Sequence, residues 1–113
     1  MDGCIFCGIV AGKIPAEVVA EDADFVAFRD IAPKAPVHLL VIPRIHVASL
    51  AAAGDLPEPV RARMPVFIAD VAAAAGLAES GYRVAANHGP DSRQAVFHLH
   101  WHVLGGALLS DGM

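Results

Sequence analysis

Apolar positions along the chain fall into short runs separated by turn residues, and one longer segment carries a helical pattern. Residues 57–75 place apolar side chains at spacings of three and four, which predicts an amphipathic main helix that ends near Gly76. Pro59 suits the first turn of that helix, whereas Pro65 predicts either a kink or a later start, and the pattern does not decide between them. Residues 5–10 predict a short N-terminal helix.

Five shorter segments predict strands, since each is rich in apolar or β-branched residues and bounded by turn residues. They are residues 17–20, 25–29, 37–42, 83–87 and 96–104. The order of elements is three strands, one main helix and two more strands. This order indicates an α+β fold, in which an antiparallel sheet of about five strands carries the helix on one face. A chain of 113 residues fits a single domain, so we expect one domain over residues 1–113.

Charge and composition narrow the possible partners. Apolar residues make up 56% of the chain, which is typical of a globular protein, and the formal net charge is −4. A negative balance is a poor basis for binding nucleic-acid backbones, so phosphate recognition would depend on a few local donors. The sequence has no apolar run long enough to span a bilayer and no basic stretch typical of a signal peptide. We therefore expect a cytoplasmic protein with neither nucleic acid nor membrane as a partner.

Three histidines, His98, His100 and His102, alternate with apolar residues in the last predicted strand. Alternation on a strand puts the imidazoles on one face, and Leu99, Trp101 and Val103 on the other, toward the core. A chance cluster on a solvated face, a metal site and a catalytic site are all open interpretations. Neighbours on one strand face lie roughly 7 Å apart, so three would converge poorly on one ion. Neutral imidazole is a nucleophile near neutral pH, which favours catalysis.

The string His-Leu-His-Trp-His-Val-Leu at residues 98–104 resembles the signature of the histidine triad (HIT) family. Other parts of the chain match the same family, and together they span nearly all of it: residues 4–15, 28–31 and 38–46, with Asn87, Gln94 and the glycine pair 105–106. The match is most similar to the Hint branch, in a bacterial form with an N-terminal Cys-x-x-Cys. The resemblance implies a HIT-like fold, a homodimer, and hydrolysis of purine nucleoside phosphoramidates such as adenosine monophosphoramidate.

The resemblance also implies catalytic roles for three histidines. His100 corresponds to the nucleophile, which attacks the α-phosphorus and forms a nucleotidyl-histidine intermediate that water then cleaves. His102 corresponds to the residue that contacts phosphate oxygens or the leaving group. His38 corresponds to the fourth histidine of the family's site, although a lone histidine in an apolar strand is more often a satisfied core residue.

Nucleotide-binding residues follow from the same resemblance. Asn87 and Gln94 correspond to amide contacts to phosphate, and Asp30 to the residue that holds the ribose hydroxyls; without the resemblance, each reads as an ordinary turn or loop residue. The positions that correspond to the apolar slot for the base are Ile5, Phe6, Ile9, Phe28 and Leu40. No organic cofactor is implied.

The cysteine pair Cys4 and Cys7 has three interpretations. A thioredoxin-like redox motif should follow a strand, and no strand is predicted before Cys4. A structural zinc site needs two more ligands, which the family resemblance assigns to His46 and His98. Free thiols are the remaining interpretation.

The chain also departs from the family pattern. Ala95 stands where eukaryotic Hint proteins carry a serine, His88 stands where an acidic residue is common, and little chain follows Gly106. The alternatives to a phosphoramidase are a dinucleoside polyphosphate hydrolase or nucleotidyl transferase of the same superfamily, and a nucleotide-binding scaffold with vestigial activity.

Overall fold

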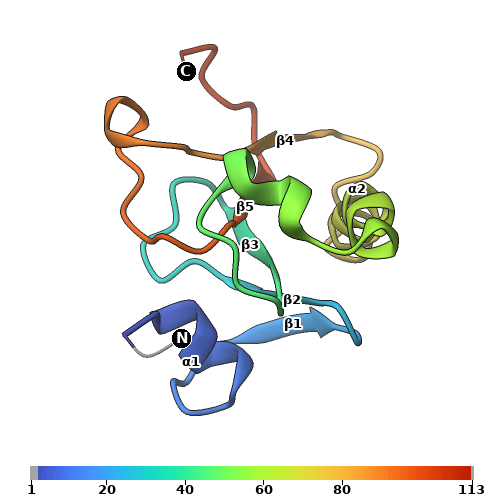
Figure 1. Ribbon diagram of the computed structural model, residues 1–113. Coiled ribbons are helices and arrows are strands. Elements are labelled where there is room, and N and C mark those ends of the chain that lie inside the picture. Colours follow the sequence, from blue (N-terminus) through green and yellow to red (C-terminus); the bar gives the residue numbers. More distant parts are fainter. Residues whose placement is uncertain (1–2, 113) are drawn as a thin grey trace.

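A five-stranded antiparallel sheet forms the centre of the molecule, with strand order β1-β2-β3-β5-β4 (Figure 1). The computed structural model describes residues 3–112. The elements are α1 (Ile5–Val10), β1 (Val18–Glu21), β2 (Phe25–Arg29), β3 (Val37–Pro43), η1 (Leu50–Asp55), α2 (Glu58–Ala74), β4 (Tyr82–Ala85), η2 (Pro90–Ser92) and β5 (Trp101–Gly105), where η marks a 3-10 helix. The predicted α+β class, with one main helix and a short N-terminal helix, is confirmed.

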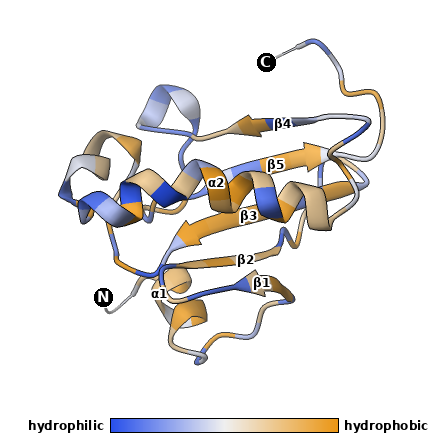
Figure 2. Ribbon diagram, turned by 90° about the vertical axis from the view of Figure 1, so that its right-hand side faces the viewer, coloured by the Kyte–Doolittle hydropathy of each residue, from blue (hydrophilic) through white to orange (hydrophobic). Residues whose placement is uncertain are grey.

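Helices cover both faces of the central strands, with α2 across one face and α1 against the other (Figure 2). On β2, Phe25 and Ala27 belong to the core beneath α2, whereas Val26 and Phe28 pack with Phe6 of α1. The strand β3 divides its apolar residues in the same way and is buried from His38 to Pro43. Burial on both faces explains why these two strands are almost continuously apolar in sequence.

The main helix α2 runs from Glu58 to Ala74 with Pro65 inside it, so the possibility of a later start at Pro65 is wrong. Pro65 itself is exposed. The buried residues of α2 form the predicted stripe: Val60, Met64, Phe67, Ile68, Val71 and Ala72. Burial of this stripe against the sheet outweighs the cost of about 3 kcal/mol that an interior proline imposes.

The last strand is shorter than predicted, because β5 begins at Trp101 and not at residue 96. Ladder pairing of this segment with β3 and β4 begins only at Trp101 and His102, and the Leu99 N–H donates instead to the Val47 carbonyl, at 2.7 Å. The expected alternation of side chains survives this change, since Leu99 and Val103 lie in the core beneath α2 while the histidines between them face α1. The strand β4 was expected to reach Asn87 but ends at Ala85, because residues 86–100 form a long connection to β5.

Among residues 3–112, no helix has both the length and the apolar character needed to cross a bilayer.

Candidate active site

An apolar cleft of about 360 Å³ opens between α1 and the face of the sheet that carries the histidines. Two of the three catalytic candidates, His100 and His102, line it, and so does Asp30, whereas His38 is not part of the lining. All five residues expected to form the base slot line it as well: Ile5, Phe6, Ile9, Phe28 and Leu40. The volume lies within the range of small-ligand sites, and largely apolar walls with a few polar groups are typical of them.

Part of this lining was not predicted from the sequence. Additional walls come from the segment after α1, from the end of β2 and the residues after it, and from the residues that precede the histidines: Ile14, Pro15, Ala16, Arg29, Ile31, Ala95 and Val96. Most of these residues are apolar and carry no chemistry of their own, so their sequence signal was their place beside matched motifs.

His100 is buried and its ring is held by a hydrogen bond within its own segment. Its Nδ1 lies 2.8 Å from the carbonyl oxygen of His98. A carbonyl only accepts, so Nδ1 carries the proton and Nε2 keeps its lone pair. The ring of Phe6 packs edge-on against His100, with centroids 5.1 Å apart. The structure thus directs Nδ1 of His100 to the backbone and leaves Nε2 as the nitrogen available for nucleophilic attack.

His102 and His38 form a directed pair. The Lys34 N–H donates to Nδ1 of His38 at 3.0 Å, so the proton of the neutral His38 ring is on Nε2. That nitrogen lies 2.9 Å from Nδ1 of His102 and 3.4 Å from an Asp30 carboxylate oxygen. Because Nδ1 of His102 accepts the hydrogen bond from His38, the proton of the neutral His102 ring is on Nε2. The chain of bonds therefore makes His102 a hydrogen-bond donor beside the cleft.

Burial keeps these rings neutral. It lowers the pKa of His102 to about 4, with the His100 and His38 rings adding to the effect. Burial also lowers the pKa of His38, against the opposing field of Asp30. At neutral pH His102 and His38 are therefore uncharged, and the backbone and each other set their hydrogen-bond roles.

The loop before the histidines uses its amide side chains to hold its own backbone. Asn87 donates from Nδ2 to the Ser92 carbonyl, and Gln94 bonds to the backbone of Ala48, Gly89 and Val96. Neither amide residue is among those that line the cleft. Their expected contact with phosphate stays a prediction.

His88, one of the two departures from the family pattern in this loop, is exposed. Its Nδ1 lies 2.7 Å from the hydroxyl of the buried Ser49, which also accepts from the Ala51 N–H. The hydroxyl therefore donates to His88 and ties the loop to the start of η1.

Four residues from three distant segments meet beside α1: Cys4, Cys7, His46 and His98. Their ligand atoms all lie within 4.8 Å of one another, so the cluster could hold a metal ion. The pairs that involve the His98 Nδ1 measure 3.2 Å to the His46 Nδ1 and 3.4 and 3.5 Å to the Cys4 and Cys7 sulfurs. A tetrahedron with ordinary Zn–N and Zn–S bonds has edges of about 3.4 to 3.8 Å, close to these values.

The surroundings of the cluster also suit a cation. His98 donates from Nε2 to the Pro43 carbonyl at 2.8 Å, which points a bare Nδ1 at the other three ligands. Burial and the neighbouring Cys4 raise the pKa of the Cys7 thiol, so holding both sulfurs as thiolates needs a compensating positive charge. The donor set and its orientation therefore fit a tetrahedral metal site.

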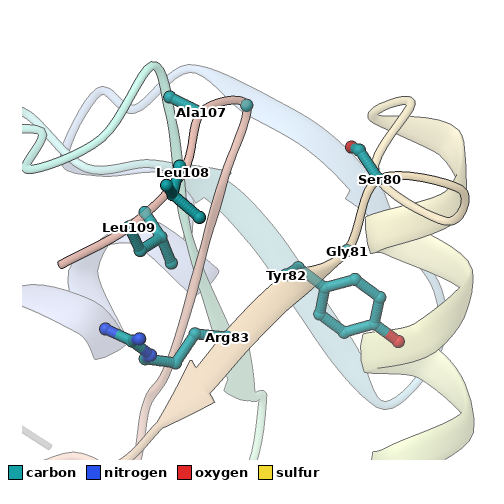
Figure 3. A pocket seen from close by; sticks show the side chains of 8 residues that line it. Ser80, Gly81, Tyr82, Arg83, Ala107, Leu108 and Leu109 are labelled. Atoms are coloured by element: carbon teal, nitrogen blue, oxygen red, sulfur yellow. The ribbon is translucent and has the colours of Figure 1, made fainter. Parts of the chain in front are cut away.

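A larger cleft of about 480 Å³ lies elsewhere, between the start of β4 and residues 106–109 (Figure 3). Its lining, all within the described residues, contains Arg83 but no histidine, cysteine or carboxylate. The proposed nucleophile His100 is at the histidine cleft and not at this one.

Fold and site together define a member of the histidine triad class, and the comparisons agree. The HIT domain family matches residues 11–108, so the chain belongs to the HIT family. It is 46% identical over 105 residues to protein HitA of Neisseria gonorrhoeae, covering 93% of this chain and 97% of that protein. The purine nucleoside phosphoramidase of Escherichia coli (strain K12) is 39% identical over 102 residues, covering 90% and 86%.

A solved structure gives the same result for the fold. The HIT family hydrolase from Clostridium thermocellum superimposes with a TM-score of 0.89 at 35% identity, covering all of this chain and 98% of that one. At the level of the family, the comparisons support a hydrolase.

Proposed function

We propose that this protein hydrolyses purine nucleoside phosphoramidates through a covalent intermediate on His100. The observation that carries the proposal is the His98 carbonyl, which accepts a hydrogen bond from Nδ1 of His100 and leaves Nε2 as a nucleophile. The adjoining cleft has apolar walls for a base and Asp30 for ribose hydroxyls. The phosphoramidase from Escherichia coli adds support at the level of substrate class.

The reaction would proceed in two displacements. In the first, Nε2 of His100 forms a bond to the α-phosphorus while the P–N bond to the leaving amine breaks, and the amine takes the Nε2 proton of His102. In the second, water attacks the same phosphorus and returns a proton to His102, the bond to His100 breaks, and the nucleoside monophosphate leaves. Splitting one hard displacement into two easier ones is the advantage of a covalent intermediate.

The remaining groups of the site would orient the reacting groups and hydrogen-bond to the phosphate. His102 donates from Nε2 to a phosphate oxygen or the leaving group, and His38 fixes the orientation of that ring through its 2.9 Å bond. Asp30, close to His38, keeps the pKa of that ring from falling further. The backbone N–H groups of Ala95 and Val96, at the cleft wall, supply further donors to the phosphate.

We also propose that the cluster of Cys4, Cys7, His46 and His98 binds zinc. Zinc would supply structural cross-linking and no step of the reaction. Because Cys4 caps α1 and the helix itself carries Cys7 and three residues of the base slot, the ligands would fix one wall of the cleft against the sheet. His98 would act on His100 only through position.

A homodimer is the third proposal. The strand β4 is an edge of the sheet, and its residues are exposed. Beside it lies an apolar groove of about 530 Å³, lined by Ala53, Arg61, Met64, Pro65, Ile68, Ala69, Tyr82, Val84 and Trp101. An unpaired edge next to an apolar groove suits pairing with a second copy of the chain.

Turnover of adenosine monophosphoramidate by wild type and by His100→Ala tests the proposed activity. We expect the variant to lose about 10³-fold or more in kcat, because no other group replaces the nucleophile. His88→Ala is the matched control, since that ring is exposed and lies outside the cleft lining; it should retain most of the activity.

Two further readouts sharpen the test. Denaturing mass spectrometry of quenched wild type should find the nucleotidyl group on the peptide that contains His100. Equal rates in wild type and His100→Ala would refute the nucleophile assignment. Faster turnover of a dinucleoside polyphosphate than of the phosphoramidate would favour the alternative substrate class.

A further inference from the structure

The side chain of Gln94 has more backbone partners than any other side chain of the loop between β4 and β5. Its Oε1 accepts from the Gly89 N–H at 3.0 Å, and its Nε2 donates to the carbonyls of Ala48 and Val96 at 2.9 and 3.1 Å. The opposite orientation of the amide would place Oε1 against two carbonyls and Nε2 against an N–H. The orientation of Gln94 is therefore determined by its partners.

These contacts use every donor that Gln94 has. A carboxamide offers two N–H groups, and both are directed at carbonyls. An anion can only accept hydrogen bonds, so binding phosphate with this side chain would require breaking a bond that holds the loop. The Gln94 side chain therefore holds the loop backbone in place and does not have a donor left for a ligand. We call its three bonds, to Gly89, Ala48 and Val96, the Gln94 brace.

The braced segment lies at the cleft. Ala95 and Val96 follow Gln94 directly, and both line the cleft together with His100 and His102. Their backbone N–H groups have no hydrogen-bond partner within residues 3–112. Val96 is half-buried and Ala95 is exposed. A half-buried backbone donor normally has a partner, so the free Val96 N–H, with the Ala95 N–H beside it at the cleft wall, points to a ligand that accepts.

The brace also reaches across the fold. The Ala48 carbonyl lies in the segment between β3 and η1, and the adjacent Val47 carbonyl accepts from the Leu99 N–H at 2.7 Å. The loop is thus fixed on both sides of residues 95–98 to the same short stretch of chain. Within the loop, the Ser92 hydroxyl donates to the Gly89 carbonyl at 2.8 Å and reaches no residue outside it.

We propose that Gln94 is a positioning residue, whose carboxamide holds the Ala95 and Val96 N–H groups in place for the phosphate of a bound nucleotide. This inference rests on the proposed function for the identity of the ligand. The ligand group is the α-phosphate, and the base and ribose parts of the cleft are independent of the brace.

Gln94→Met tests the proposal, because methionine keeps the length of the side chain and removes all three bonds. Calorimetry would compare the binding of AMP and of adenosine to wild type and variant. We expect the Kd for AMP to rise by about tenfold or more, since misplaced donors lose charged hydrogen bonds, while the Kd for adenosine changes less than about threefold. Ser92→Ala is the control, which removes one bond internal to the loop and should leave both affinities near wild type.

Hydrogen exchange of the ligand-free proteins completes the experiment. The brace predicts faster exchange of the amides at residues 89–97 in Gln94→Met, whereas a direct phosphate contact would leave the ligand-free loop unchanged. Equal losses of AMP and adenosine affinity would show a merely structural role and overturn the proposal, as would unchanged exchange. A wild type that binds AMP but does not cleave the phosphoramidate would refute the proposed function and leave the brace standing.

Discussion

The depressed pKa of His102 predicts a specific dependence of stability on pH. Replacing His102 by Gln removes the titrating ring while keeping a polar side chain of similar reach. Above pH 6.5 the ring is neutral in both the folded and the unfolded state, so it adds no pH dependence. Between pH 6.5 and about 4 the unfolded chain takes up a proton that the folded protein refuses, so the free energy of unfolding falls as the pH falls.

The size of the effect follows from the pKa difference. A fall from 6.5 to about 4 corresponds to about 3 kcal/mol as an upper bound, at about 1.4 kcal/mol for each pKa unit. The ring is partly accessible to solvent and shares a proton with His38, so we expect about 1 to 3 kcal/mol.

Urea unfolding of wild type and His102→Gln at pH 7 and pH 4 would measure this difference. Loss of metal ligation in acid affects both proteins alike, so it cancels in the comparison. Wild type should lose more stability than the variant between the two pH values. A difference between the proteins that is the same at both pH values would refute the reasoning.

Three other predictions concern the metal cluster, the edge strand and the core. Metal analysis should find about one zinc for each wild-type chain and little in Cys4→Ser, and a chelator should lower the melting temperature of wild type only; wild type purified without metal would refute the site. Val84→Arg on β4 should shift sedimentation from dimer toward monomer, and a monomeric wild type would remove the basis for a dimer. Leu39→Ala, beneath α2, should cost about 2 to 5 kcal/mol in urea unfolding. The exposed Val66→Ala should change stability by less than about 0.5 kcal/mol, and similar losses in both variants would contradict the described core.

The order of apolar and turn residues predicted correctly those helices and strands that are defined by a few neighbouring residues. The short helix of residues 5–10 and the strand of residues 25–29 appear with the predicted bounds, since each is defined by its own apolar residues and flanking turns. The boundary of the last strand was wrong, because Leu99 bonds to Val47 and not to a neighbouring strand. Periodicity contains no information about which partner a backbone group finds.

The order of residues specifies the chemistry present: three alternating histidines and two cysteines three positions apart. The fold specifies which of these groups meet. It brings Cys4 to His98 across 94 positions, and His38 to His102 across 64. It also decided the proton positions, since the Pro43, His98 and Lys34 backbone groups select which nitrogen of each ring is free. A histidine can donate or accept at either nitrogen, so its role is fixed by the partner the fold supplies.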